Sequence, residues 1–175
     1  MDVDRTTDMR TRSGWTPAVA PIGLILMLLG AWAFFAPLVG PYFNYGFDSD
    51  TAWQFSTQQW ELSLGPGIAV FVGGLLMMLP SRGPAWLAGL LATAGGIWLI
   101  VGPSVYPLWG SELSPDGSTG MQTLKWIGYF YGTGALATYF AAFAQGLLSR
   151  RTTVERRVAP AAAEPDRVGL ERRAA

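Results

Sequence analysis

The distribution of charge along the chain constrains its fold more than any other feature. Of the 12 basic and 12 acidic side chains, 17 lie in residues 1–12 and 150–175, and the 137 residues between them carry only seven. Charged residues make up about a quarter of an ordinary soluble domain, so a stretch this poor in charge is typical of a membrane domain. The sequence therefore predicts a membrane domain with a polar segment at each end.

Four apolar segments are long enough, or nearly so, to cross a bilayer, which requires about 20 residues. They are residues 17–39, 62–79, 84–105 and 124–148. In hydrocarbon each backbone amide must find a partner within its own segment, so uncharged segments of this length form helices. A soluble bundle would need a polar stripe on each helix, and none of the four segments has one. We therefore expect an all-α membrane protein with four transmembrane helices.

Arginine residues indicate how these helices are oriented. The two longer connections, 40–61 and 106–123, contain no Lys or Arg, whereas the termini and the connection between the second and third segments do: Arg5, Arg10, Arg12, Arg82, Arg150 and Arg151. Basic residues near membrane spans concentrate on the cytoplasmic side. We therefore expect both termini in the cytoplasm (N-in/C-in). A cleaved signal peptide is the alternative interpretation of residues 1–40, but the apolar stretch is too long and no clear cleavage site follows it.

The third segment repeats the first at an offset of 66 residues. Residues 17–41 and 83–107 share seven identities, and the most informative of them are Gly30, Trp32, Pro37 and Pro41, which recur as Gly96, Trp98, Pro103 and Pro107. A shared Trp and two shared Pro are not explained by apolar composition alone. The sequence predicts two tandem helical hairpins, 15–80 and 83–148, as parallel repeats related by an axis along the membrane normal. Tails of residues 1–14 and 149–175 flank them on the cytoplasmic side.

The motif Gly-x-Trp-x4-Pro, used twice in a four-helix chain, resembles the SPW-repeat family of small bacterial membrane proteins. The Ser-Pro-Trp that names this family corresponds here to Ala36-Pro37-Leu38 and Gly102-Pro103-Ser104, so the Pro is kept while the Ser and the Trp are not. The resemblance implies a two-helix repeat in the inner (plasma) membrane of a bacterium. It implies no reaction.

Pro37 and Pro103 are expected to kink the first and third helices near their outer ends. Proline removes one helical hydrogen bond and thereby frees the carbonyl four residues earlier, here that of Ala33 or Leu99. The freed carbonyls either form part of an ion or substrate site, as in transporters with broken helices, or accompany a kink that is only structural. The absence of ionisable side chains nearby favours the structural interpretation.

Small residues line one side of the fourth helix at spacings that favour close helix packing. The candidate helix–helix interface consists of Gly128, Gly132, Gly134, Thr138, Ala142 and Gly146. This interface either packs within the four-helix unit or forms a face for another subunit, and both alternatives stay open at this point.

The first outer connection is unusually aromatic. Its candidate contact residues are Tyr42, Phe43, Tyr45, Phe47, Trp53, Phe55 and Trp60. Aromatic residues at this depth normally anchor a chain at the membrane interface, and they are also enriched in protein-binding surfaces. The tail of residues 149–175 lacks aromatic residues, so we expect it to be disordered; a short helix on anionic lipid is the alternative.

The chain offers few groups for catalysis. It contains no Cys and no His, which excludes thiolate and imidazole metal sites and triad chemistry, and none of the four segments has an ionisable residue at its centre. We expect no catalytic residue, no metal, no cofactor and no nucleic-acid partner. The predicted function is that of a non-enzymatic structural or accessory subunit that contacts membrane lipids and other membrane subunits or copies of itself. The alternative is a carrier or binder of a small apolar molecule such as a lipid, a quinone or a pigment.

Overall fold

The computed structural model describes residues 19–47, 51–79, 82–111, 113, 115 and 117–161. The segments 1–14 and 162–175, which belong to the two predicted tails, lie outside the described residues, and so do Trp15 and residues 48–50. Within the described part the regular elements are all helical, as the sequence predicts.

Four long helical segments make up the structure. The first is α1 (Ala20–Val39), which continues into the 3-10 turn η1 (Gly40–Phe43). The second comprises α2 (Thr57–Gln59), the π turn η2 (Trp60–Leu64) and α3 (Gly65–Met78). The third is α4 (Arg82–Val105) with the 3-10 turn η3 (Tyr106–Leu108). The fourth comprises α5 (Thr119–Trp126), the π turn η4 (Ile127–Tyr131) and α6 (Gly132–Ala161).

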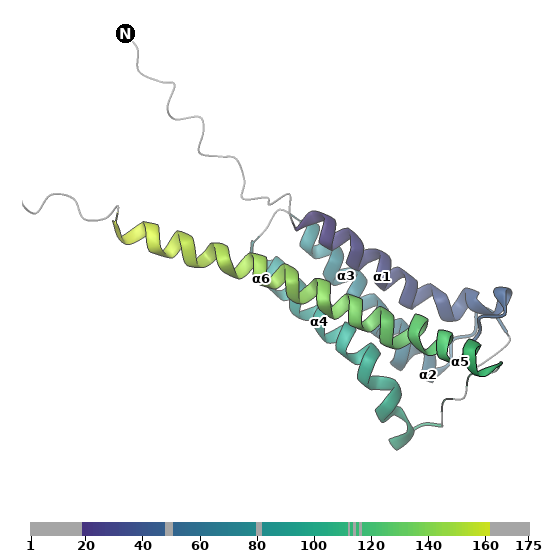
Figure 1. Cartoon of the computed structure of the whole chain (residues 1–175). Coiled ribbons are helices and arrows are strands. Elements are labelled where there is room, and N and C mark those ends of the chain that lie inside the picture. Colours follow the sequence, from purple (N-terminus) through teal and green to yellow (C-terminus); the bar gives the residue numbers. More distant parts are fainter. Residues whose placement is uncertain are drawn as a thin grey trace, which may run out of the picture.

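These segments pack side by side in chain order. α1 packs on α3, α3 on α4 and α4 on α6, and α6 completes the bundle through a smaller contact with α1. The described residues of the connections 44–56 and 109–118 lie at one end, with α2 and α5, and we call this the loop end (Figure 1). At the opposite end α6 extends beyond the other helices.

The core changes character along the bundle. Away from the loop end half of its buried residues are alanines, namely Ala88, Ala92, Ala137, Ala141 and Ala144, and the rest are aliphatic residues and Met77. Toward the loop end it contains the rings of Phe47, Tyr106, Tyr129 and Phe130. Alanine permits close approach of helix backbones, whereas aromatic rings hold them apart. The bundle is accordingly narrow at one end and splayed at the loop end, where α1 and α4 diverge (Figure 1).

Three helical segments of the described residues are long and apolar enough to cross a membrane: Ala20–Phe43, Thr57–Met78 and Ala85–Leu108. These lengths and compositions are typical of a multi-pass membrane protein. The helix that continues through α6 is not among them in the described part of the chain, because Thr, Gly and Gln residues lower its hydropathy.

The second helical segment begins earlier than the apolar run 62–79 predicts. Ser56 caps it: the Ser56 hydroxyl accepts from the Gln59 amide N–H at 3.1 Å, and the Gln59 side chain accepts from the Ser56 N–H at 3.4 Å. This reciprocal capping box starts the helix at Thr57, and the segment then reaches the length that a span requires.

The fourth helix ends later than predicted. α6 runs on to Ala161, so residues 150–161 are helical where we expected a disordered tail. Extending an existing helix adds one hydrogen bond per residue without a new nucleation step, which explains why a segment without an apolar face continues it.

Candidate functional site

Two π turns occupy equivalent places in the two halves of the chain. η2 begins at Trp60 and η4 at Ile127, an offset of 67 residues, and each is followed by a glycine whose N–H donates to the first carbonyl of the turn. π turns of this kind are rare and are frequent at functional sites. The loop end of the bundle, where both π turns lie, is therefore the first region in which to look for a functional site.

Each π turn receives an indole hydrogen bond from the other half of the chain. Trp32 of α1 donates through Nε1 to the Gly128 carbonyl at 2.8 Å, and Trp98 of α4 donates to the Glu61 carbonyl, also at 2.8 Å. The two Trp are the residues of the repeated motif, and the two carbonyls are related by the offset of 67. Pro66 has no N–H to offer the Glu61 carbonyl in the π register, so the Trp98 indole supplies a donor there.

The carbonyl that Pro37 frees is satisfied. The Ser63 hydroxyl, on η2, donates to the Ala33 carbonyl at 2.7 Å, and both residues are buried. The equivalent of Ser63 in the second half is Phe130, which has no hydroxyl. In the first half, therefore, the freed carbonyl serves helix packing and is not open to an ion. α1 and α4 both continue through their prolines and change to 3-10 turns that contain Pro41 and Pro107.

Tyr129 joins three elements at the loop end. Its hydroxyl is within hydrogen-bond reach of the Ala36 carbonyl, at 3.0 Å, and of the Tyr45 carbonyl. The Tyr45 ring stacks on the Tyr129 ring, with their centroids 5.1 Å apart. The Tyr45 hydroxyl donates to the Leu124 carbonyl at 3.0 Å. Burial raises the pKa of Tyr45 above its usual 10. Sequence reasoning did not single out Tyr129 or Ser63, although Ser63 is the only polar side chain of the predicted span 62–79.

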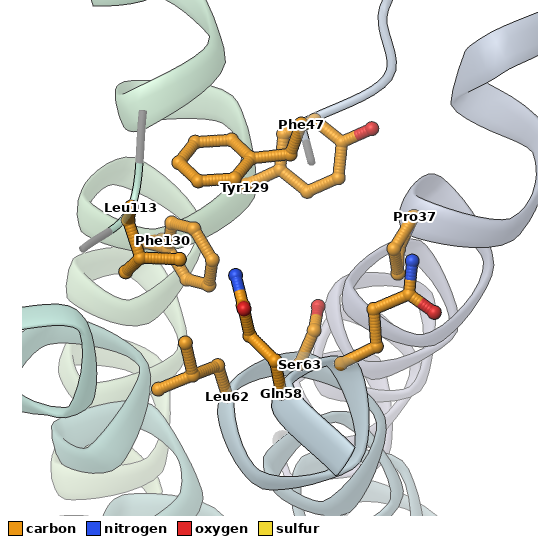
Figure 2. A pocket seen from close by; sticks show the side chains of 9 residues that line it. Pro37, Phe47, Gln58, Leu62, Ser63, Leu113, Tyr129 and Phe130 are labelled. Carbon is orange, nitrogen blue, oxygen red and sulfur yellow. The ribbon is translucent and has the colours of Figure 1, made fainter. Parts of the chain in front are cut away.

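A small cavity lies between η2 and this aromatic cluster. Its volume is about 20 Å³, enough for one water molecule. Pro37, Phe47 and Tyr129 line one part of it, and Gln58 and Ser63 line another (Figure 2). The cavity is too small for an organic substrate.

The seven candidate residues of the aromatic connection divide into two sets. Phe47 is buried and packs on Trp126, Tyr129 and Phe130, and Tyr45 is partly buried beside it. The other five are exposed: Tyr42, Phe43, Trp53, Phe55 and Trp60. Trp53 adopts a left-handed backbone (φ 60°), and its N–H donates to the Leu38 carbonyl at 3.1 Å, which ties the connection to the end of α1.

An apolar groove of about 340 Å³ follows the outside of α1 at the loop end. Trp32, Phe35 and Val39 of α1 line it, together with Phe43 of η1 and Tyr45. This volume is within the usual range for small-molecule sites, which is about 300–1,000 Å³.

The candidate interface on the fourth helix also divides into parts. Gly134 and Thr138 pack on α4: a Cβ added to Gly96 would lie 2.6 Å from Thr138 Oγ1 and 3.1 Å from the Gly134 carbonyl oxygen. Gly128 packs against the Tyr45 hydroxyl, and Gly132 lies over the carbonyl of Ile127 in its own turn. Ala142 and Gly146 remain exposed, and nothing lies within 4 Å of a Cβ built on Gly146.

Other polar side chains are few. Gln145 donates through Nε2 to Thr93 Oγ1 at 2.9 Å and thereby links α6 to α4, and the Thr93 hydroxyl donates to the Gly89 carbonyl. The buried polar or charged residues in the described part are Ser63, Lys125 and Thr133. Among the same residues no group of three or more His, Cys, Asp or Glu is placed to hold a metal ion.

No protein-family model, no curated protein and no solved structure matches the chain.

Proposed function

We propose that the chain is a non-enzymatic accessory subunit of a larger assembly in the plasma membrane of a bacterium, with four spans and both termini in the cytoplasm. The observation that carries this proposal is the uncovered half of the small-residue stripe on α6. The bundle covers Gly134 and Thr138 with α4 but leaves Ala142 and Gly146 bare. Small residues gain little from lipid and much from close contact with another helix, so this face has room for a helix of a further subunit or of a second copy.

The outward face of α6 supports its place as the fourth span. Leu136, Tyr139 and Phe143 are each at least half exposed, and large apolar side chains on the outside of a bundle favour contact with lipid or with a neighbouring membrane helix. α1, α3 and α4 present such residues in the same way, among them Leu28, Leu75 and Leu87.

The accessory function is tested by purification from the native membrane in gentle detergent, followed by mass spectrometry. Ala142→Leu and Gly146→Leu should each remove the co-purifying subunit, because a leucine would keep the partner helix from approaching. Ala94→Leu is the matched control, since Ala94 is an exposed alanine on α4. Unchanged co-purification in both α6 variants, or no partner with the wild-type chain, contradicts the proposal.

A second candidate function is that of a carrier or binder of a small apolar molecule. The 340 Å³ groove on α1 favours it, because four of its lining side chains are aromatic. This groove is separate from the exposed face of α6, so the two functions are tested independently.

A further inference from the structure

The groove on α1 has walls that hydrogen bonds hold in place. The Trp32 indole is fixed on the Gly128 carbonyl and the Tyr45 hydroxyl on the Leu124 carbonyl. Both acceptors belong to the fourth helical segment, so the groove depends on the contact between the first and last segments. A site whose walls are already in place loses less conformational entropy on binding than one that must form around its ligand.

The chemistry of the lining defines what can occupy the groove. No polar atom contributes to its surface, because the indole N–H and the phenol hydroxyl both point to backbone carbonyls. A quinone ring or a polar pigment buried there would leave its own oxygens without partners, which is unfavourable in apolar surroundings. A hydrocarbon chain has no such groups.

The shape of the groove agrees with a chain rather than a compact ligand. Its lining follows one helix from Trp32 through Phe35 and Val39 to Phe43 and Tyr45. At about 1.5 Å per helical residue, this extends over more than one turn of α1 toward the loop end. A chain lying along it would leave its polar headgroup beyond Phe43, outside the apolar span.

We propose that the groove binds one acyl chain of a membrane phospholipid, laid along α1 with the headgroup at the loop end. The proposal rests on the second candidate function and names the ligand of that site. The second half of the chain provides a contrast: at the offset of 66, Val101 stands in place of Phe35 and Ser111 in place of Tyr45. Two of the aromatic walls are therefore missing there, and the equivalent stretch 98–109 should hold only bulk lipid.

The test uses the full-length protein in phosphatidylcholine vesicles that contain a phospholipid with a photoreactive diazirine in its acyl chain. After illumination, peptide mass spectrometry maps the labelled residues. Labelling of residues 32–43 should exceed that of 98–109 by about tenfold, which corresponds to a preference of about 1.4 kcal/mol. Equal labelling of the two stretches overturns the proposal; the binder function falls with it only when gentle purification also retains no quinone or pigment.

Two matched variants make the test specific. Val39→Phe fills the groove and should reduce labelling of 32–43 to the level of 98–109, whereas Val105→Phe, at the equivalent position, should leave the ratio unchanged. Strong labelling that survives Val39→Phe overturns the proposal. If Val39→Phe does not fold, the wild-type ratio decides alone. Quinone or pigment retained in place of phospholipid after gentle purification overturns the acyl-chain assignment but leaves the binder function standing.

Discussion

The buried Ser63 side chain replaces a backbone hydrogen bond that α1 lacks at Pro37. Its hydroxyl is the donor for the Ala33 carbonyl that Pro37 leaves without a helical partner. Ser63→Ala should lower the free energy of unfolding by about 1 kcal/mol: an unsatisfied buried carbonyl costs about 1–3 kcal/mol in water-soluble proteins, and hydrogen bonds between membrane helices average about 0.6 kcal/mol. Unfolding by added sodium dodecyl sulphate, followed by circular dichroism, measures the change.

The control for Ser63 is Thr123→Ala. The Thr123 hydroxyl is exposed and donates to the Thr119 carbonyl within its own helix, where solvent or headgroups can replace it. Loss of the Thr123 hydroxyl should lower the free energy of unfolding by less than half of the change expected for Ser63→Ala. Equal losses for the two variants would mean that the freed carbonyl has no special dependence on Ser63.

The two motif tryptophans should differ in how much their hydrogen bonds stabilise the protein. Trp32→Phe and Trp98→Phe each remove one 2.8 Å hydrogen bond to a π-turn carbonyl while keeping an aromatic ring. The Gly128 carbonyl retains the Thr133 hydroxyl as a donor at 2.6 Å, whereas Pro66 offers the Glu61 carbonyl no N–H, so Trp98→Phe should cost about 1 kcal/mol and Trp32→Phe less than that. Trp86→Phe, at an exposed tryptophan outside these contacts, should be neutral in the same unfolding assay. An equal loss in the two motif variants would contradict this difference between the two carbonyls.

At the residue scale the sequence predicted which backbone carbonyls the prolines free, but it did not predict which side chains hydrogen-bond to them. Proline chemistry alone identified the Ala33 carbonyl as freed, because the effect is local along the chain. That Ser63 satisfies it depends on how α1 and the π turn η2 pack against each other. For the same reason composition could not separate Phe47, which is buried, from Phe43, which is 75% exposed, although both belong to one aromatic connection.

At the scale of elements, the contact between α4 and α6 depends on Gly96. Gly96→Ala would place its Cβ 2.8 Å from the Thr138 backbone nitrogen, so the two helices must separate, and overpacking of this kind costs about 1–3 kcal/mol. Gly146→Ala should be neutral or slightly stabilising for the isolated chain, because that position is open and alanine is the better helix former. Comparing the two variants by thermal unfolding in detergent checks both; equal destabilisation would contradict this helix packing.

This packing also changes which substitutions test assembly. Thr138 lies against Gly96, so a leucine there disturbs the bundle itself, whereas Ala142 does not have this contact. The spacing of small residues predicted a packing face on α6. It could not show which part of that face α4 covers and which part stays exposed. The π turns were not predicted either, since they arise where one extra residue widens a helix and leave no mark in hydrophobic periodicity.

At the scale of the whole molecule, hydrophobicity predicted four helices that cross the membrane, and three helices of the described residues are long and apolar enough to do so. It did not predict that the bundle splays toward the loop end, because that shape follows from which side chains meet in the core: alanines at one end and the rings of Tyr129 and Phe130 at the other. The fourth helix is the least apolar of the four because it devotes a face to Gly and Thr against α4. The Gly and Thr residues that let the fourth helix pack closely on α4 thus also lower the hydropathy by which a membrane span is recognised.

The number of spans decides where the C-terminus lies. With four spans, both termini and Arg82 share one side; with three, the C-terminus would be on the other side from the N-terminus. Arg150 and Arg151 lie within α6, directly after the predicted span 124–148, and moving them across the membrane opposes the preference of basic residues for the cytoplasmic side. We therefore expect a green fluorescent protein fused after Ala175 to be fluorescent and an alkaline phosphatase fused there to be inactive. A phosphatase inserted in the first connection, after Gln54, should be active. Active phosphatase at the C-terminus would mean that α6 does not cross the membrane, and the four-span topology would then be wrong.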